Sequence, residues 1–112
     1  MRDKTYFVKI TTQAEEQLQA IVQYISSELK APKAALSLLD EIESATLSLS
    51  QFPQRVALTE EEPWRSLGIH KMPVKNFLVY FWIDEENIKV QVTAVIYGRC
   101  DQIKQLSQMD ME

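Results

Sequence analysis

The chain has 112 residues, of which 46% are hydrophobic and 25% charged, with only two glycines. This composition is that of one ordinary globular domain, and it excludes a disordered or low-complexity chain. The net charge of −4 argues against broad, sequence-independent binding of nucleic acid, because that affinity comes from Lys and Arg at phosphates. A local basic site remains compatible with an acidic total.

A single cysteine, Cys100, allows no internal disulfide, which suits a reducing compartment. The first residues lack the apolar run of a secretion signal. The longest apolar run is also far shorter than the roughly 20 residues that a membrane span needs. We therefore expect a soluble, cytoplasmic protein without a membrane partner.

The N-terminal half predicts a short strand followed by a helical hairpin. Thr12 followed by Glu15 has the spacing of a capping box, which marks the start of a helix. Apolar residues then recur every three or four positions, and Pro32 both interrupts the pattern and fits the first turn of a second helix. The expected elements are a strand over 6–10 and helices over about 13–30 and 33–51.

Two features of this region leave alternatives open. Leu36 and Leu47 fall off the apolar stripe of the second helix, so they are either ordinary exposed leucines or a minor contact face for a partner. Residues 53–65 predict a loop with two prolines, and their acidic run 60–62 reads most simply as solvated surface.

The C-terminal half predicts three strands, over 67–72, 77–83 and 88–97. A tight polar loop joins the last two, which should form an antiparallel hairpin. The order β-α-α-β-β-β predicts an α+β domain, in which a helical hairpin packs on one face of a small, mainly antiparallel four-stranded sheet. We expect this domain to span residues 1–101, followed by a tail over 102–112 that is frayed or folded back on the sheet.

Strand alternation divides the hairpin into two faces. The uniformly apolar set of the last strand is expected to face the helices: Ile88, Val90, Val92, Ala94 and Ile96. The opposite face should carry Leu78, Tyr80 and Trp82, together with Val95 and Tyr97. This open face would expose an apolar patch that either binds a partner or is covered by the C-terminal tail.

Sequence motifs of the common enzyme classes are absent. No metal site is expected, because His70 has no ligand partner at a typical spacing. There remains a cationic and phenolic set: Arg65, His70, Lys71, Lys75, Tyr97 and Arg99. Such groups could hold phosphates, stabilise developing charge and move a proton, or they could form a solvated basic rim.

Several soft motifs follow one another in a specific order. The first strand is followed by Thr and Ala, the helical hairpin ends at Phe52-Pro53, and a short strand carries Lys71. The sequences of residues 76–80, Asn-Phe-Leu-Val-Tyr, and 95–101, Val-Ile-Tyr-Gly-Arg-Cys-Asp, complete the pattern. From residue 5 to about 101, the chain resembles the RelE/ParE superfamily of bacterial toxins from type II toxin–antitoxin modules.

The resemblance implies a small cytoplasmic growth inhibitor, neutralised by an antitoxin whose extended C-terminal segment wraps the toxin surface. RelE-like members cut mRNA at the ribosome without a metal or other cofactor, whereas ParE-like members bind and inhibit DNA gyrase. The same fold is thus found in enzymes that cleave RNA and in proteins that act only by binding a target. A third interpretation is a non-toxic relic that serves only as the partner of its antitoxin.

The resemblance also assigns roles to individual residues. Lys71 and Arg99 match basic positions of the ribonuclease type, and Tyr97 lies near a catalytic His or Tyr, so these three are the candidate catalytic residues. The candidate target- or antitoxin-binding residues are Leu78, Tyr80, Trp82, Arg65 and His70. Leu78 and Ile69 stand where ribonuclease members carry Arg and Lys. These departures favour a ParE-like binding function slightly over RNA cleavage.

Overall fold

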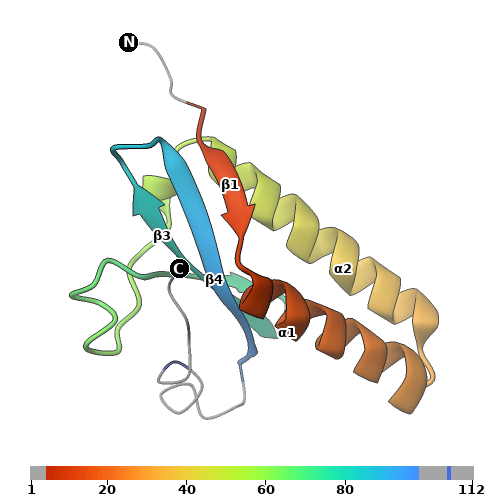
Figure 1. Ribbon diagram of the computed structural model, residues 1–112. Coiled ribbons are helices and arrows are strands. Elements are labelled where there is room, and N and C mark those ends of the chain that lie inside the picture. The colour runs from red at the N-terminus through yellow and green to blue at the C-terminus, as the bar shows by residue number, and fades with distance from the viewer. Residues whose placement is uncertain (1–4, 99–105, 107–112) are drawn as a thin grey trace.

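The computed structural model describes residues 5–98 and Leu106 (Figure 1). In chain order, the helices and strands are β1 (Phe7–Ile10), α1 (Thr12–Gln23), a π-helical turn (Tyr24–Glu28), α2 (Pro32–Leu47), β2 (His70–Val74), β3 (Phe77–Asp84) and β4 (Lys89–Tyr97). Short 3-10 turns at Ser48–Ser50 and Pro53–Arg55 follow α2.

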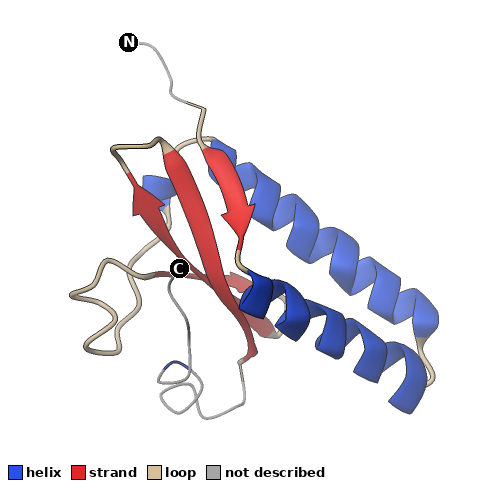
Figure 2. Ribbon diagram, in the orientation of Figure 1, coloured by secondary structure: helices blue, strands red, loops and turns tan. Residues whose placement is uncertain are grey.

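The four strands form one sheet in the order β1-β4-β3-β2. The β2–β3 and β3–β4 pairs are antiparallel, whereas β1 runs parallel to β4. Figure 2 shows the helical hairpin as a separate layer beside this sheet. The predicted α+β architecture is therefore confirmed. Within the described parts of the chain, no helix is long and apolar enough to cross a membrane.

The N-terminus of α1 lies one residue before the predicted one. The N-cap is Thr11, whose side-chain oxygen accepts a hydrogen bond from the backbone N–H of Ala14 at 3.2 Å. Thr12 is the first helical residue and is exposed. The predicted cap at Thr12 was therefore wrong, since Thr11 has the extended backbone that a cap requires. Pro32 does occupy the first turn of α2, as predicted.

Strand β2 runs beyond the expected end at Met72. Pro73 lies inside the strand, paired with Leu78 of β3. A proline fits there because β2 is an edge strand, so a missing N–H on the outer side breaks no ladder. The strand also starts later than expected, at His70, and the segment before it forms turns.

The main core lies between the helices and one face of the sheet. It contains Ala14 and Leu18 of α1 with Leu38 and Ile42 of α2. The sheet contributes buried side chains from its three longer strands: Val74, Val79, Phe81, Val90, Val92 and Val95. Leu36 and Leu47 are exposed, at 60% and 68%, which leaves both interpretations of these leucines open.

A β-bulge changes which side chains of β4 face the helices. Tyr80 pairs with Ala94 and Phe81 with Val92, so Thr93 is the additional residue opposite them. Because alternation restarts after the bulge, Val95 packs in the helix-facing core. Ala94 and Ile96 turn to the opposite face. The predicted helix-facing position was therefore correct for Val90 and Val92, and wrong for Ala94 and Ile96.

Candidate functional site

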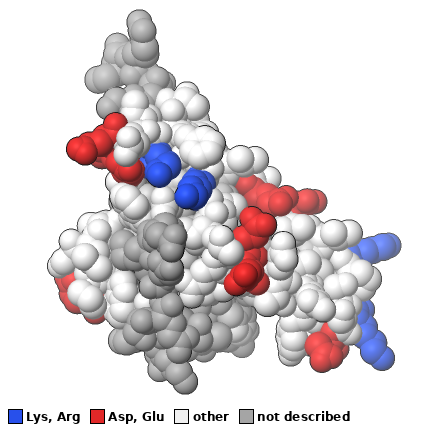
Figure 3. Space-filling model, viewed as in Figure 1, with Lys and Arg blue, Asp and Glu red and all other residues white. Residues whose placement is uncertain are grey.

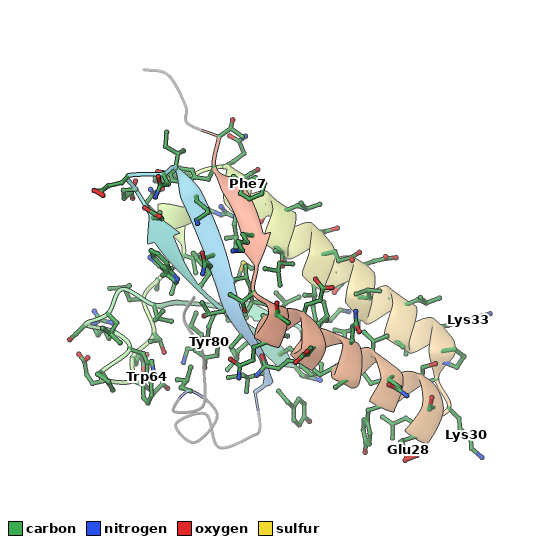
Figure 4. All side chains as sticks on the ribbon, viewed as in Figure 1. Phe7, Glu28, Lys30, Lys33, Trp64 and Tyr80 are labelled. Atoms are coloured by element: carbon green, nitrogen blue, oxygen red, sulfur yellow. The ribbon has the colours of Figure 1, made fainter. Side chains whose placement is uncertain are left out.

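The sheet face away from the helices is sealed by a second apolar cluster, which we call the distal cluster. Its buried members are Ile69, Tyr80, Ala94, Ile96 and Leu106, and the half-buried Trp64, Leu78 and Trp82 pack against them. Figure 4 shows Trp64 in the segment before β2 and Tyr80 on the sheet. Leu78, Tyr80 and Trp82 do lie on this face as predicted, but the exposed patch does not form: Tyr80 is 0% exposed and Leu106 1%.

The burial of Leu106 is the one described contact of the C-terminal tail. Leu106 lies in sequence well beyond β4, yet it packs among the side chains of the sheet. The other residues of the predicted tail, and the boundary at residue 101, lie outside the described residues.

The segment that carries the acidic run lies over Lys71. The Nζ of Lys71 is 3.5 Å from Oε2 of Glu61, and both side chains are about four-fifths buried. The hydroxyl of Thr59 donates to the other carboxylate oxygen of Glu61. This hydrogen bond, followed by one from the backbone N–H of Glu61 itself and then by the charge of Lys71, holds the pKa of Glu61 below its ordinary value despite partial burial. The candidate catalytic lysine therefore has an internal carboxylate partner.

Tyr80 lies next to Lys71 in the β2–β3 ladder. Burial, reinforced by the negative charge of Glu61, raises the pKa of the Tyr80 hydroxyl far above its ordinary value. A phenol in this state stays protonated at neutral pH. Tyr80 therefore contributes packing and a polar hydroxyl to the distal cluster, and it does not supply a phenolate.

His70 and Arg65 are used in local structure. The His70 ring stacks on Phe81, with ring centroids 4.9 Å apart, and its Nδ1 is hydrogen-bonded to the backbone oxygen of Val56 at 2.7 Å. Because Phe81 belongs to the helix-facing core, this stacking places the His70 ring on the helical side of the sheet. Arg65 is exposed, and its guanidinium donates to the backbone oxygen of Thr59 at 3.3 Å. Of the two, only Arg65 is exposed, so only its side chain is accessible to a partner.

Tyr97 does not join Lys71. Its ring packs against Phe77, with centroids 5.3 Å apart, and Phe77 belongs to the helix-facing side. The bulge explains the difference, because it reverses the face of every residue that follows it in β4. Tyr97 and Lys71 therefore lie on opposite faces, so Tyr97 is not on the face where the sequence analysis expected it. Arg99 lies outside the described residues.

A shallow hollow of about 410 Å³ lies beside Lys71 at the β2–β3 turn. It is lined by Lys71, Pro73, Lys75, Asn76, Phe77, Leu78 and Gly98, without an acidic residue. Lys75 is 3.4 Å from Glu41 of α2, so each lysine has a glutamate partner from another element. The hollow could hold a small anion, but its charge is already largely balanced. Within residues 5–98 and Leu106, no group of three metal-ligating side chains occurs.

A larger hollow, about 530 Å³, lies between α1 and α2, and we call it the interhelical groove. Its lining comprises Ile10, Glu15, Leu18, Gln19, Val22, Gln23, Ser26, Ser27, Leu39, Ile42, Glu43 and Thr46. The sequence shows only that apolar residues recur every three or four positions along the two helices, and nothing in it predicts the groove. Periodicity shows that a residue belongs to an apolar stripe, but it does not show how closely two stripes pack.

Basic side chains are few on the face that carries the distal cluster. Figure 3 shows a small basic spot over the β1 and β4 side of this view, with acidic groups close by. Lys9 and Lys89 lie on this side of the sheet. Lys9 pairs with Gln91 of β4, and Lys89 and Gln91 alternate along that strand with the helix-facing Val90 and Val92. On this face, the described residues therefore form no broad basic surface of the kind that follows an RNA backbone.

Comparison with known proteins gives consistent results. Residues 8–101 match the family described as ParE toxin of type II toxin–antitoxin system, parDE. A chain of the chromosomal ParDE system from P. aeruginosa is 21% identical, with a TM-score of 0.68 over 83% of this chain and 96% of that one. The RelBE2 toxin–antitoxin complex from Mycobacterium tuberculosis contains a chain that is 22% identical, with a TM-score of 0.59 over 84% and 92%.

A free RelE toxin mutant from E. coli is 10% identical, with a TM-score of 0.60, and the match covers 90% of this chain and 92% of that one. A comparison with curated proteins found no match. At these identities, the likeness to solved structures shows the fold, and it confirms the RelE/ParE-like architecture expected from the sequence.

Proposed function

Because the chain belongs to the ParE toxin family of type II toxin–antitoxin systems, we propose that it inhibits growth by binding a target protein such as DNA gyrase. On this proposal it acts in the cytoplasm without a metal or cofactor, and a cognate antitoxin neutralises it. RNA cleavage at the ribosome is the alternative activity.

Binding is favoured over cleavage because the sheet face is filled with apolar side chains and its lysine is already paired. Cleavage of RNA without a metal needs charged side chains that point towards the reacting phosphate and are free to contact it. Here Lys71 is held by Glu61, and Tyr97 lies on the other face of the sheet. The distal cluster fills the centre of the face with apolar side chains. This arrangement supports binding by shape and surface better than catalysis.

One feature favours the ribonuclease alternative. The hollow beside Lys71 has two lysines and no acid in its lining, and Gly98, which lines it, directly precedes Arg99 in the chain. A phosphate entering this hollow would compete with Glu61 and Glu41 for the lysines. The test must therefore include Lys71 and Arg99.

Expression of the chain without any antitoxin tests the proposal. We expect growth arrest with a DNA-damage response, and inhibition of supercoiling by purified gyrase in vitro. Lys71→Ala, Tyr97→Phe and Arg99→Ala should each leave bulk mRNA intact, as the wild type does. Rapid mRNA loss that disappears in Lys71→Ala or Arg99→Ala would instead establish the ribonuclease. Unaffected growth at confirmed expression would indicate the relic.

A further inference from the structure

Lys71 stands between an internal carboxylate and an open hollow. Its Nζ is 3.5 Å from Oε2 of Glu61, and the same side chain lines the hollow of about 410 Å³ at the β2–β3 turn. Lys71 belongs to β2, an edge strand, and its strand partner is Tyr80 of the distal cluster. One lysine is therefore shared between a contact within the chain and a cavity that opens to solvent.

The lining of this hollow suits an anion. It combines two lysines and an asparagine amide with an apolar wall, and it contains no carboxylate: Lys71, Lys75, Asn76, Pro73, Phe77, Leu78 and Gly98. Gly98 donates its backbone N–H to the backbone oxygen of Asn76 at 2.8 Å, and a Cβ at Gly98 would lie 3.0 Å from that oxygen. Glycine thus allows the residue after β4 to approach the turn closely, beside both lysines.

The two lysines are held by carboxylates to different degrees. The side chains of Lys75 and Glu41 are 56% and 47% exposed, so water and salt weaken their ion pair. Those of Lys71 and Glu61 are 23% and 22% exposed, and a largely buried pair is screened much less. An anion that enters the hollow therefore meets one lysine that is easily recruited and one that is already engaged.

Glu61 is placed beside Lys71 by a fixed backbone. The hydroxyl of Thr59 donates to the carboxylate, and Thr59 is fully buried, with its backbone N–H bonded to the backbone oxygen of Ile69 at 2.9 Å. On the other side, the backbone N–H of Arg65 donates to the backbone oxygen of Glu61 at 2.9 Å. A carboxylate tethered in this position has a high effective concentration at Lys71, so a free anion must compete with it.

We propose that Glu61 is a built-in block of the hollow: it holds Lys71 and thereby prevents a phosphate group from binding between the two lysines. A carboxylate and a phosphate both accept charge-assisted hydrogen bonds from an ammonium group, so the two compete for the same lysine. The inference rests on the function proposed above, because it gives a physical reason why the sheet face does not take up the phosphate that cleavage requires. A neutral residue at position 61 should then release Lys71 to an anion.

Glu61→Gln tests the block, because glutamine keeps the size of the side chain and removes its charge. The matched control is Glu60→Gln, which makes the same change in net charge at an exposed neighbour. A double variant, Glu61→Gln with Lys71→Gln, asks whether a gain depends on the lysine. The probe is inorganic phosphate, added to the isotope-labelled full chain at constant ionic strength. Binding is followed by the NMR shifts of the backbone amides of residues 75–78, after circular dichroism confirms that each variant is folded.

We expect Glu61→Gln to bind phosphate at least about tenfold more tightly than the wild type, because a competing ion-pair partner is removed. Glu60→Gln should stay within about threefold of the wild type, since an exposed charge has little effect. The double variant should lose the gain. An affinity of Glu61→Gln no higher than that of Glu60→Gln would overturn the block, and so would a gain that persists without Lys71.

The titration contains no gyrase, antitoxin or RNA. Failure of the block therefore shows itself in the phosphate affinities, whereas failure of the proposed function shows itself only when the chain is expressed without antitoxin.

Discussion

The three consecutive glutamates at 60–62 occupy three different environments. Glu60 is exposed. Glu61 lies largely buried between the Thr59 hydroxyl and Lys71. Glu62 accepts a hydrogen bond from the backbone N–H of Ser66 at 3.0 Å. A run that reads in sequence as one solvated surface is therefore a solvated residue, an internal ion-pair partner and a turn-stabilising acceptor.

Glu61→Gln should lower stability in a pH-dependent way. The folded-state pKa of Glu61 is depressed below the ordinary 4.5, so its contribution is present above that pH and is lost as pH falls through the folded value. At pH 7 we expect the variant to be less stable by about 1 kcal/mol. The difference should narrow as the pH drops below 4.5. Urea unfolding at a series of pH values measures it.

Glu60→Gln is the matched control, because it removes the same charge from an exposed neighbour without a hydrogen bond or ion pair in the described structure. It should change the free energy of unfolding by less than about 0.5 kcal/mol at every pH. A pH dependence in Glu60→Gln equal to that of Glu61→Gln would show that general charge repulsion, and not the contact with Thr59 and Lys71, is responsible.

At the residue level, the sequence was more informative about which strand carries a side chain than about the residue that pairs with it. The sequence left open which face of the sheet Lys71 and Ile69 occupy, and the structure places both on the face of Tyr80. The carboxylate that pairs with Lys71 comes from a loop without periodicity, and no local pattern predicts where such a loop settles. The roles assigned to Lys71, Tyr97 and Arg99 remain predictions.

At the level of elements, the start of α1 offers a direct comparison between two neighbouring threonines. Thr11→Ala removes the cap on Ala14 and should destabilise the protein by about 1 kcal/mol. Thr12→Ala, on the exposed first helical residue, should change stability by less than about 0.5 kcal/mol. Urea unfolding of the two variants in parallel makes the measurement. The reverse order would restore Thr12 as the cap.

The elements also show what a sequence pattern leaves undetermined. Periodicity predicted both helices and all four strands, because each buries one stripe or one face. The cap was ambiguous, since two threonines stand side by side and either can accept a hydrogen bond. No glycine marks the bulge at Thr93 in the sequence. Residues 92–95, Val-Thr-Ala-Val, are as compatible with an unbroken strand as with a bulged one.

At the level of the whole molecule, the distal cluster joins segments that lie far apart in the chain. Trp64 comes from the loop before β2, Tyr80 and Trp82 from β3, and Leu106 from beyond the sheet. The sequence showed apolar residues on both faces of β3, and it allowed either exposure or a cover. Only the tertiary arrangement decides between them, because the covering residues have no local pattern that ties them to the strand.

Leu106→Ala tests whether this cover stabilises the fold. Truncation of a leucine that is 1% exposed should cost about 2–4 kcal/mol, because apolar contacts are lost and a cavity remains. Both tryptophans of the chain, Trp64 and Trp82, pack against the same cluster. Their fluorescence should therefore shift to longer wavelength in the folded variant, as water reaches the cluster. Urea unfolding followed by fluorescence gives both quantities.

Leu36→Ala serves as the control, since it removes the same atoms from an exposed helical position that is 60% accessible. Alanine suits a helix at least as well as leucine, so the free energy of unfolding should change by less than about 0.5 kcal/mol, with no fluorescence shift. If Leu106→Ala proved as neutral as Leu36→Ala, the sheet face would not depend on Leu106 for its cover. The distal cluster could then open to a partner without loss of the fold.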